Sequence, residues 1–198
     1  MWYVVQVTTG RERDIAKELN GRGIRALVPV ENRLIRRGGR WTQSEYVLFG
    51  GYVFLDMAYN AENYYRVKRI PGVLHFLGES GNPSKLSWLE AEWIQLLTGR
   101  DNAPIEPTLV KADAEGRLKA VKGVLEKVES RLISWDRRSR KAAFEITVCG
   151  EKKEVRLSIL LEEDLLQMQE TEKAAAGNDT AEESTEESTE EEILQEAD

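Results

Sequence analysis

Two side chains of this sequence could form a nucleophile and its base, the thiol of Cys149 and the imidazole of His75. Each is the only residue of its type in the chain. Cys149 follows the strand-like residues 146–148, which favours a buried, unreactive thiol over a catalytic one. Glu90 and Glu92 stand two positions apart on an expected helix and therefore do not face each other. No Walker-type or dinucleotide-type phosphate loop occurs, so we expect no enzyme, no cofactor and no metal site.

Charge divides the chain into a basic body and an acidic tail. Residues 162–198 contain fifteen Asp or Glu and one Lys, a net charge of -14, whereas residues 1–161 carry +7. A basic body favours a polyanionic partner. The tail has too little apolar surface to offset the entropy of ordering it, so we expect it to be mostly disordered. It would act as a solubilising tail or compete with nucleic acid for the basic body.

The basic residues gather on an early helix and on a hairpin. The expected first helix carries Arg11, Arg13, Lys17 and Arg22. Such side chains contact phosphates and supply sequence-independent affinity for nucleic acid. The hairpin has a Gly-Gly turn whose tip carries three arginines, which indicates either a finger that reaches a phosphate backbone or a solvated turn that resists edge pairing. These three residues are Arg36, Arg37 and Arg40.

The chain contains no sign of export or membrane insertion. No apolar run approaches the length of a membrane-spanning helix, and no signal peptide precedes the first strand pattern. A single cysteine allows no internal disulfide and fits a reducing compartment. We therefore expect a cytoplasmic monomer without a membrane partner.

One stretch, Phe49–Met57, organises the first half of the chain. Two glycines at 50 and 51 allow a bend before the strand. Tyr52 and Phe54 then alternate with Val53 and Leu55, so each pair occupies one face. The aliphatic face suits a core. The aromatic face suits either a second buried layer or a partner that binds aromatic side chains.

The first 99 residues alternate strand and helix patterns. Their order is strand, helix, hairpin, strand, helix, strand, helix, which predicts an antiparallel sheet with helices packed on it, an α+β domain. Capping-box spacing from Thr9 to Glu12 predicts a helix over about 11–20. The same spacing from Ser87 to Glu90 predicts a helix that runs to about residue 97.

The second half has a different pattern. Residues 100–107 are expected to be a linker. Residues 108–161 contain five short strand patterns with polar turns between them, typical of a small β-barrel. We thus expect domains over 1–99 and 108–161, followed by the acidic tail over 162–198. A basic turn of the barrel is a candidate partner contact and contains Arg137, Arg138, Arg140 and Lys141.

Three motifs, in order, resemble the NusG family of transcription elongation factors. They are Trp2-Tyr3-Val4-Val5-Gln6, then Phe49-Gly50-Gly51-Tyr52-Val53-Phe54-Leu55, then Ile70-Pro71-Gly72-Val73-Leu74-His75-Phe76. The resemblance extends over about residues 1–160, and Gly123–Ala142 is similar to the core of the family's KOW barrel. It implies an NGN-like N-terminal domain joined to an SH3-like KOW barrel.

The resemblance implies that the N-terminal domain binds the clamp helices of RNA polymerase through a hydrophobic surface and suppresses pausing. On the matching positions, this polymerase-binding surface contains Phe49, Tyr52 and Phe54, with His75 and Phe76 near it. Tyr52 and Phe54 would then face the polymerase while the aliphatic face of the strand packs in the core.

Further contacts follow from specialised relatives. Asn63, Tyr64 and Tyr65 fall where such relatives contact the polymerase β subunit. The basic residues of the first helix fall where they contact non-template DNA or nascent RNA. The barrel would contact a ribosomal protein or Rho.

Departures from the family pattern favour a specialised paralogue. Gly50 replaces the usual proline of the family. The short, arginine-rich first helix and the shortened hairpin resemble antiterminators of the RfaH type and especially of the LoaP type. We therefore expect a factor recruited by a nucleic-acid signal at selected operons. The alternatives are a general NusG that couples polymerase to Rho or the ribosome, and a ribosome-associated KOW protein that binds RNA.

Overall fold

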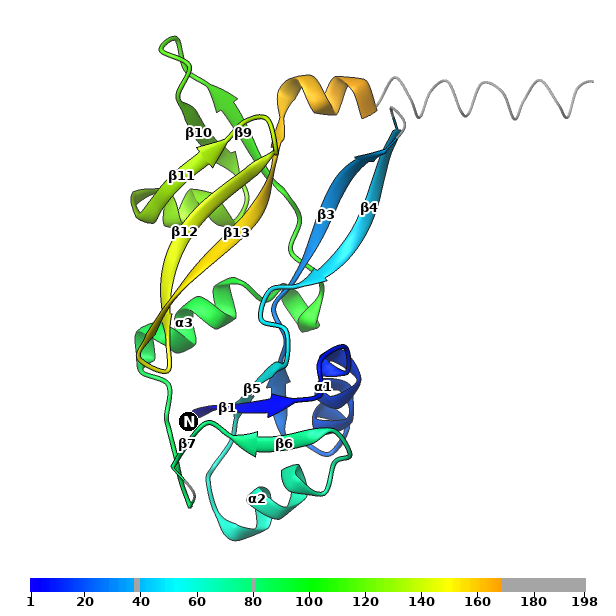
Figure 1. Cartoon of the computed structure of the whole chain (residues 1–198), viewed down its shortest axis with the longest axis vertical. Helices are drawn as coiled ribbons and strands as arrows, with labels where there is room; N and C mark the ends of the chain where they lie inside the picture. The colour runs from blue at the N-terminus through cyan, green and yellow to red at the C-terminus, as the bar shows by residue number, and fades with distance from the viewer. Residues whose placement is uncertain (38–39, 80, 169–198) are drawn as a thin grey trace, which may run out of the picture.

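The computed structural model describes residues 1–37, 40–79 and 81–168, with side chains except at 36–37, 40–41, 100 and 129–131. The Gly38-Gly39 turn and the tail beyond residue 168, which we expected to be disordered, lie outside these residues. Figure 1 shows an elongated molecule, with an N-terminal sheet at one end and a C-terminal sheet at the other. A hairpin of the N-terminal half extends alongside the C-terminal sheet.

The N-terminal sheet is antiparallel and has the strand order β2-β5-β1-β6. Two helices, α1 and α2, pack on one of its faces, as the alternating pattern predicts. Ile15 and Leu19 of α1 are fully buried there against Val53 and Leu55 of β5. The elements are β1 (Trp2–Val7), α1 (Glu12–Gly21), β2 (Arg25–Leu27), β5 (Tyr52–Asp56), α2 (Ala61–Lys68) and β6 (Val73–Phe76).

The predicted capping box at Thr9 is wrong. Helix α1 begins at Glu12 after Arg11, and no side chain caps it. Glu12 is buried and accepts hydrogen bonds from the backbone N–H groups of Gly10, at 2.9 Å, and Gly51, at 2.6 Å. The carboxylate therefore fixes the loop before β5 and does not pair with Thr9. The second predicted box is confirmed, because Ser87 and Glu90 cap helix α3 (Trp88–Leu96) reciprocally.

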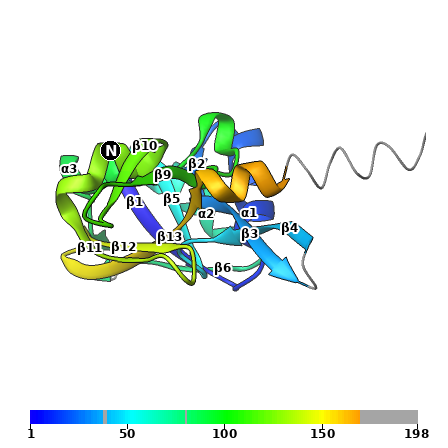
Figure 2. The same cartoon turned by 90° about the horizontal axis from the view of Figure 1, so that it is seen from above.

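The predicted hairpin is formed by β3 (Val30–Arg37) and β4 (Arg40–Val47), which pair antiparallel along their length. We call these two strands the finger. The expected strand region 24–34 is divided at Pro29, which lies between β2 and β3 and accepts a hydrogen bond from Leu48 N–H at 2.9 Å. Figure 2 shows the finger extending to one side of the molecule.

The five C-terminal strands expected from the sequence are confirmed and form a curled sheet with the order β10-β9-β13-β12-β11. Neighbours are antiparallel except β13 and β9, which are parallel. The remaining elements are β7 (Gly78–Glu79), β8 (Asn82–Pro83), η1 (Arg100–Asn102), β9 (Thr108–Ala112), β10 (Leu118–Lys122), η2 (Val124–Arg131), β11 (Leu132–Asp136), β12 (Lys141–Val148) and β13 (Glu151–Leu161).

The finger and the C-terminal sheet are joined by a buried carboxylate. Glu31 of β3 is only 1% exposed and accepts a short hydrogen bond from the backbone N–H of Ser158 in β13. Its other oxygen lies 2.7 Å from Arg33 Nε and 3.9 Å from Lys141 Nζ. Buried carboxylates need such partners. Ile105, within the expected linker, adds two backbone hydrogen bonds to β3.

The second face of the N-terminal sheet packs against the C-terminal half. Val4 and Phe54 share one apolar cluster with Trp93 of α3 and with Phe144 and Val148 of β12. The rings of Trp93 and Phe144 lie 6.5 Å apart. The N-terminal sheet is thus covered on both faces, by its own helices and by the β12–β13 hairpin.

Candidate interaction surfaces

One row of side chains crosses the N-terminal sheet on the face opposite its helices. Gln6 of β1 lies directly between Tyr52 of β5 and His75 of β6 in the strand register. Phe54 belongs to the same face, opposite Val4, because side chains alternate along a strand. Phe49 joins it through an edge-to-face contact with Phe54, with ring centres 5.5 Å apart. We call Phe49, Tyr52, Phe54 and His75 the aromatic face.

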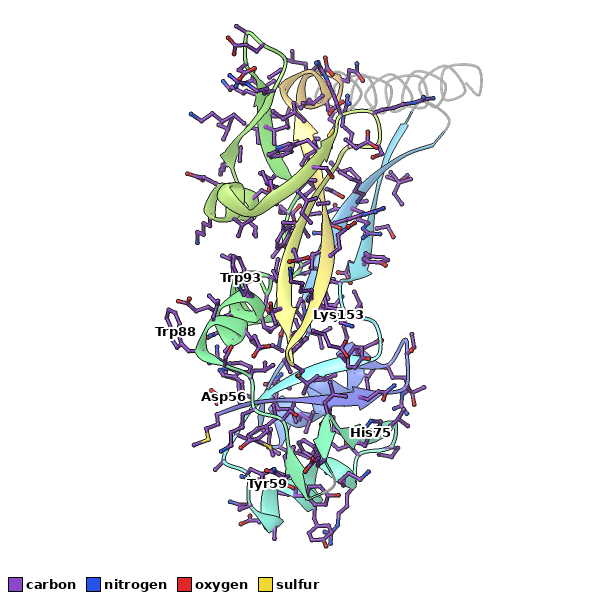
Figure 3. All side chains as sticks on the ribbon, turned by 60° about the vertical axis from the view of Figure 1, so that its left-hand side comes forward. Asp56, Tyr59, His75, Trp88, Trp93 and Lys153 are labelled. Atoms are coloured by element: carbon purple, nitrogen blue, oxygen red, sulfur yellow. The ribbon has the colours of Figure 1, made fainter. Side chains whose placement is uncertain are left out.

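The register separates Phe76 from this aromatic face. Phe76 is opposite Val5 on the helix side of the sheet, where it is buried. It stacks on Tyr64 at 5.5 Å and makes an edge contact with Tyr59 at 5.9 Å. Tyr65 is 58% exposed on α2. Figure 3 shows His75 and Tyr59 at different levels of this end of the molecule.

Asn63 lies on α2 and has a local structural role. Its side chain donates a hydrogen bond to the Ala58 carbonyl at 2.9 Å, and its backbone N–H is capped by Asn60 at 2.8 Å. Of the residues expected at the polymerase β subunit, Tyr65 is therefore the exposed one, while Asn63 and Tyr64 are partly buried.

The tip of the β12–β13 hairpin lies over the aromatic face. Phe54 is 1% exposed, and Phe49 and Tyr52 are half-buried. A pocket of about 270 Å³ remains between the two parts, and Phe49, Tyr52 and Phe54 of the aromatic face line it together with Val148 and Cys149 of the hairpin. The expectation that Phe54 faces a partner thus does not hold in this conformation, because the hairpin occupies that position. Figure 3 shows Lys153 on the hairpin, directly above the sheet.

The hairpin tip is a two-residue turn held by a carboxylate. Cys149 and Gly150 both have positive φ, 52° and 77°, as a type I′ turn requires. The Gly150 N–H donates to Glu90 Oε1 at 3.0 Å, which links the tip to α3. Burial alone would raise the pKa of Glu90, but the hydrogen bonds from Gly150 and Ser87 outweigh it and lower that pKa. Glu90 therefore receives the tip as a carboxylate.

Cys149 has the environment of an unreactive thiol. Burial first, and then the nearby carboxylates of Glu90 and Glu151, raise its pKa to about 11. At neutral pH the thiol stays protonated, and the thiolate is the reactive form. No group of three or more His, Cys, Asp or Glu side chains suited to a metal ion occurs among residues 1–168, apart from the undescribed positions.

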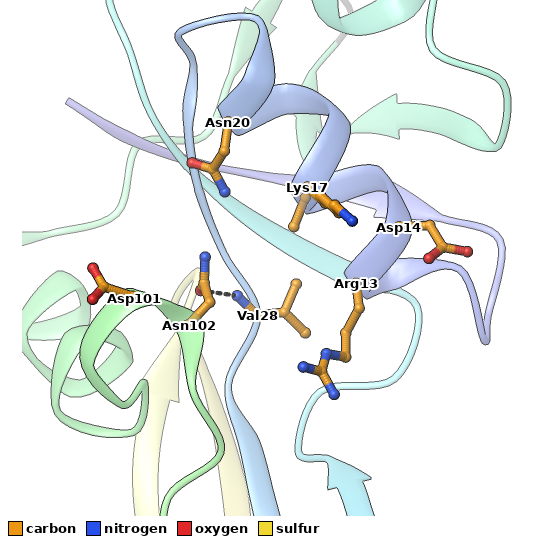
Figure 4. A pocket seen from close by; sticks show the side chains of 8 residues that line it. Arg13, Asp14, Lys17, Asn20, Val28, Asp101 and Asn102 are labelled. Atoms are coloured by element: carbon orange, nitrogen blue, oxygen red, sulfur yellow. Dashed lines mark hydrogen bonds between the residues drawn. The ribbon is translucent and has the colours of Figure 1, made fainter.

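The basic residues of α1 divide between its two edges. Arg13 pairs with Glu45 of the finger, and Lys17 is exposed beside it. Both line a pocket of about 440 Å³ with Val28 and Asn102 (Figure 4). On the other edge, Arg22 pairs with Glu18.

Arg11 and Arg22 face the α2 side. Arg22 donates to the carbonyl of Arg66 on α2 at 3.5 Å, and the Arg11 guanidinium lies against Gly72. The four basic residues expected to bind nucleic acid near the first helix thus lie in two separate groups. Arg13 and Lys17 form one group, and Arg11 and Arg22 form the other.

Two asparagines, Asn20 and Asn102, line the pocket that also contains Arg13 and Lys17, and they bond the free edge of β2. Asn20 exchanges two hydrogen bonds with the backbone of Ala26, at 2.9 and 3.0 Å. Asn102 accepts from Val28 N–H at 3.2 Å and donates to the Ala26 carbonyl at 2.8 Å (Figure 4). The two side-chain amides thus make the hydrogen bonds along β2 that a neighbouring strand would otherwise make. Apart from the amide side chains themselves, no sequence pattern indicates this pairing.

The basic turn of the C-terminal sheet is partly used within the chain. Arg140 pairs with the buried Asp164, at 2.7 Å, and Lys141 donates to Ser158 Oγ at 2.6 Å. Arg137 and Arg138 are exposed. These two remain the candidates for contact with a partner. The side chains of Arg36, Arg37 and Arg40 lie outside the described residues, and their backbone places them at the far ends of β3 and β4.

Sequence reasoning missed the residues between the expected ones. Gln6 completes the row from Tyr52 to His75, and Leu77 and Ser84 line the pocket beneath the hairpin. The alternation of Trp2, Val4 and Gln6 along β1 carried a signal for the first of these. No comparable sequence pattern indicated Leu77 or Ser84.

The chain is similar to known proteins in sequence and in structure. A family model described as NusG, transcription termination factor nusG, matches residues 1–95. The transcription termination/antitermination protein NusG of Vibrio parahaemolyticus is 31% identical over 144 residues, which cover 65% of this chain and 79% of that protein. The chain belongs to the NusG family. The NusG protein of Neisseria meningitidis serogroup B is 37% identical over 110 residues, which cover 50% of this chain and 62% of that protein.

Among solved structures, one of Thermotoga maritima NusG, described as a domain interaction, is similar over 80% of this NusG-family chain and 93% of its own. Its TM-score is 0.49 and its sequence identity 23%. Within the described part of the chain, no helix has the length and apolar character needed to cross a membrane.

Proposed function

We propose that this NusG-family chain is a transcription elongation factor that binds the clamp helices of RNA polymerase through its aromatic face. The observation that carries the proposal is the row from Tyr52 through Gln6 to His75, flanked by Phe49. Aromatic side chains with a polar residue between them are typical of protein interfaces. The names of the similar proteins, transcription termination/antitermination protein NusG, support a role in transcription.

Polymerase and the β12–β13 hairpin compete for this face in the proposed mechanism. The hairpin tip covers Phe54, so the tip must move away before the clamp helices can bind. The factor needs no catalysis, because binding one conformation of polymerase more tightly than another shifts the population toward that conformation. A polymerase whose clamp is closed would then pause less often.

The finer proposal is a recruited antiterminator that acts at selected operons. Its support is the exposed charge of Lys17 on one edge of α1 and of Arg11 on the other, with the finger extending beyond them. Nascent RNA or non-template DNA would supply the phosphates. Tyr65 on α2 is the exposed aromatic that would contact the polymerase β subunit.

A second candidate is a general NusG that couples polymerase to Rho or to a ribosomal protein. The names of the matched relatives favour it. Its contact would use Arg137 and Arg138, which are exposed on the C-terminal sheet. In transcription assays in vitro, a general factor acts on any template, whereas a recruited one acts only on templates that carry its signal.

Binding of core RNA polymerase to immobilised chain tests the proposal. We compare Phe49→Ala/Tyr52→Ala with Trp88→Ala, which removes an aromatic that is 75% exposed on α3. Burial of an aromatic contributes on the order of 2 kcal/mol, so the double variant should lose at least about tenfold in affinity. The Trp88 variant should bind like wild type. Phe54 is left unchanged because it supports the core.

The same variants are also measured in a Val148→Asp chain. That change weakens packing of the hairpin tip on the aromatic face. A loss of polymerase affinity that persists in this chain is therefore caused by the aromatic side chains and not by a change in how the hairpin tip covers them. Equal binding by all variants in both chains would reject the aromatic face as the polymerase site.

A further inference from the structure

The start of the acidic tail is already bound to the C-terminal sheet. Asp164 is 1% exposed and accepts from Arg140 Nε at 2.7 Å and Nη2 at 2.8 Å. Glu163 lies 3.1 Å from Arg140 and 3.6 Å from Arg137. Glu162 pairs with Lys111 at 2.6 Å. Three successive carboxylates thus each meet a cation of the sheet.

The rest of the tail continues the same charge. Residues 169–198 contain twelve Asp or Glu and one Lys, a net charge of -11. The helical residues 162–168, from which they continue, point toward the side of the molecule on which the finger lies (Figures 1 and 2). The far ends of β3 and β4 there carry three arginine positions, and Arg138 is exposed in the β11–β12 turn. The described chain therefore ends on the side of the molecule where these basic positions lie.

We define the basic end as positions 36, 37 and 40 of the finger together with Arg137 and Arg138. We infer that residues 169–198 bind to this basic end of the same chain. Opposite charge and the place where the described chain ends both select this occupant. A random coil of thirty residues has an end-to-end distance of about 30 Å, enough to reach along the finger. Tethering supplies an effective concentration in the millimolar range, so a weak ionic contact suffices.

The consequence rests on the nucleic-acid contact of the proposed function. A bound tail is a polyanion on the basic surface, so it competes with nucleic acid there. Weak, non-specific phosphate binding would be suppressed, and only a ligand that outcompetes the tail would bind. Because both interactions are ionic, salt weakens the tail contact as well as the contact with nucleic acid.

The test keeps the full chain and changes only the charge of the tail. One variant replaces seven tail glutamates by Gln, at 182, 183, 186, 187, 190, 191 and 192. A matched control replaces the same seven by Asp, which preserves charge. The first measurement is the amide NMR shifts of residues 36, 37, 40, 137 and 138 without nucleic acid. The second is the affinity for a single-stranded RNA of about 20 nucleotides, a polyanion that phosphate contacts would bind.

We expect the shifts of the Gln variant to differ from those of wild type at low salt, and the Asp variant to match wild type. The difference should vanish at high salt and stay constant on dilution, since the contact lies within one chain. RNA should bind the Gln variant about tenfold more tightly at low salt. Identical shifts in all three proteins would overturn the inference, and so would shifts that fade on dilution, which indicate a second copy as the occupant. Shift differences without RNA binding would support the docked tail and reject the nucleic-acid part of the proposed function.

Discussion

The two faces of the N-terminal sheet are covered in different ways. On the helix face, Val53 and Leu55 are fully buried under helices α1 and α2, which belong to the same N-terminal half. On the aromatic face, Phe49 and Tyr52 stay half-buried beneath a hairpin from the far end of the chain, and a pocket of about 270 Å³ remains. Dense aliphatic packing is typical of a permanent core. A partly hollow aromatic contact is typical of a surface that another partner can also occupy.

The hairpin that covers the aromatic face is complete by itself. Strands β12 and β13 pair over all eight residues of β12, from Lys141 to Val148. Moving the tip would break its packing on the aromatic face and the hydrogen bond between Gly150 and Glu90. It would leave the pairing between β12 and β13 intact. Exposing the helix face therefore requires unfolding, whereas exposing the aromatic face does not.

The largest expected difference between the faces is in stability. Leu55→Ala should lower the free energy of unfolding by about 3–4 kcal/mol, because it leaves a cavity in a fully packed site. Tyr52→Ala should cost less than about half of that, because Tyr52 is already partly exposed beside a pocket. Urea titration followed by circular dichroism measures both. Equal losses would show that the two faces are packed alike and would break the comparison.

A smaller effect concerns the reactivity of Cys149. Burial holds the pKa of its thiol at about 11, and an exposed thiol titrates near about 8.5. Val148→Asp should release the tip and raise the rate of thiol labelling at pH 7.5 on the order of a hundredfold, in line with the thiolate fraction. Ile133→Asp is the matched control, since Ile133 is an exposed apolar residue of β11. An unchanged rate in Val148→Asp would mean that the tip stays bound.

The smallest expected effect is the pH dependence of the tip contact. The pKa of Glu90 is lowered in the folded chain, so its contribution is complete above the unfolded value of about 4.3. That contribution is lost as the pH falls through the lowered folded pKa. Protection of the Gly150 amide against hydrogen exchange, corrected for intrinsic rates, should fall in that range in wild type. In Glu90→Gln it should be weaker and independent of pH, and a wild-type profile that is flat below pH 4.3 would argue against Glu90 as the anchor.

Local signals predicted the strands and one helix cap well. The alternation through Tyr52, Val53 and Phe54 assigned both faces of β5, and Ser87 with Glu90 fixed the start of α3. Local reasoning failed where a distant group competed. Glu12 does not cap its helix with Thr9, because the N–H of Gly51 takes its carboxylate.

The division of the candidate site also depended on long-range contacts. The irregular pairing between β1 and β6 places His75 on the aromatic face and Phe76 on the other. Adjacent residues of a strand point to opposite faces, but no sequence pattern determines which of these two shares a face with Tyr52. The hairpin over that face is held by Glu90 and Gly150, which are far apart in sequence, so its position could not be predicted.

Asn20 and Asn102 have a consequence for aggregation at high protein concentration. An open sheet edge offers a row of free N–H and C=O groups on which another chain can add a strand and start an aggregate. Along β2 these groups are already taken, because the two amides bond the backbone of Ala26 and Val28. Strand β2, one of the two outer strands of the N-terminal sheet, is thus closed to strand addition by two side chains, without an additional strand.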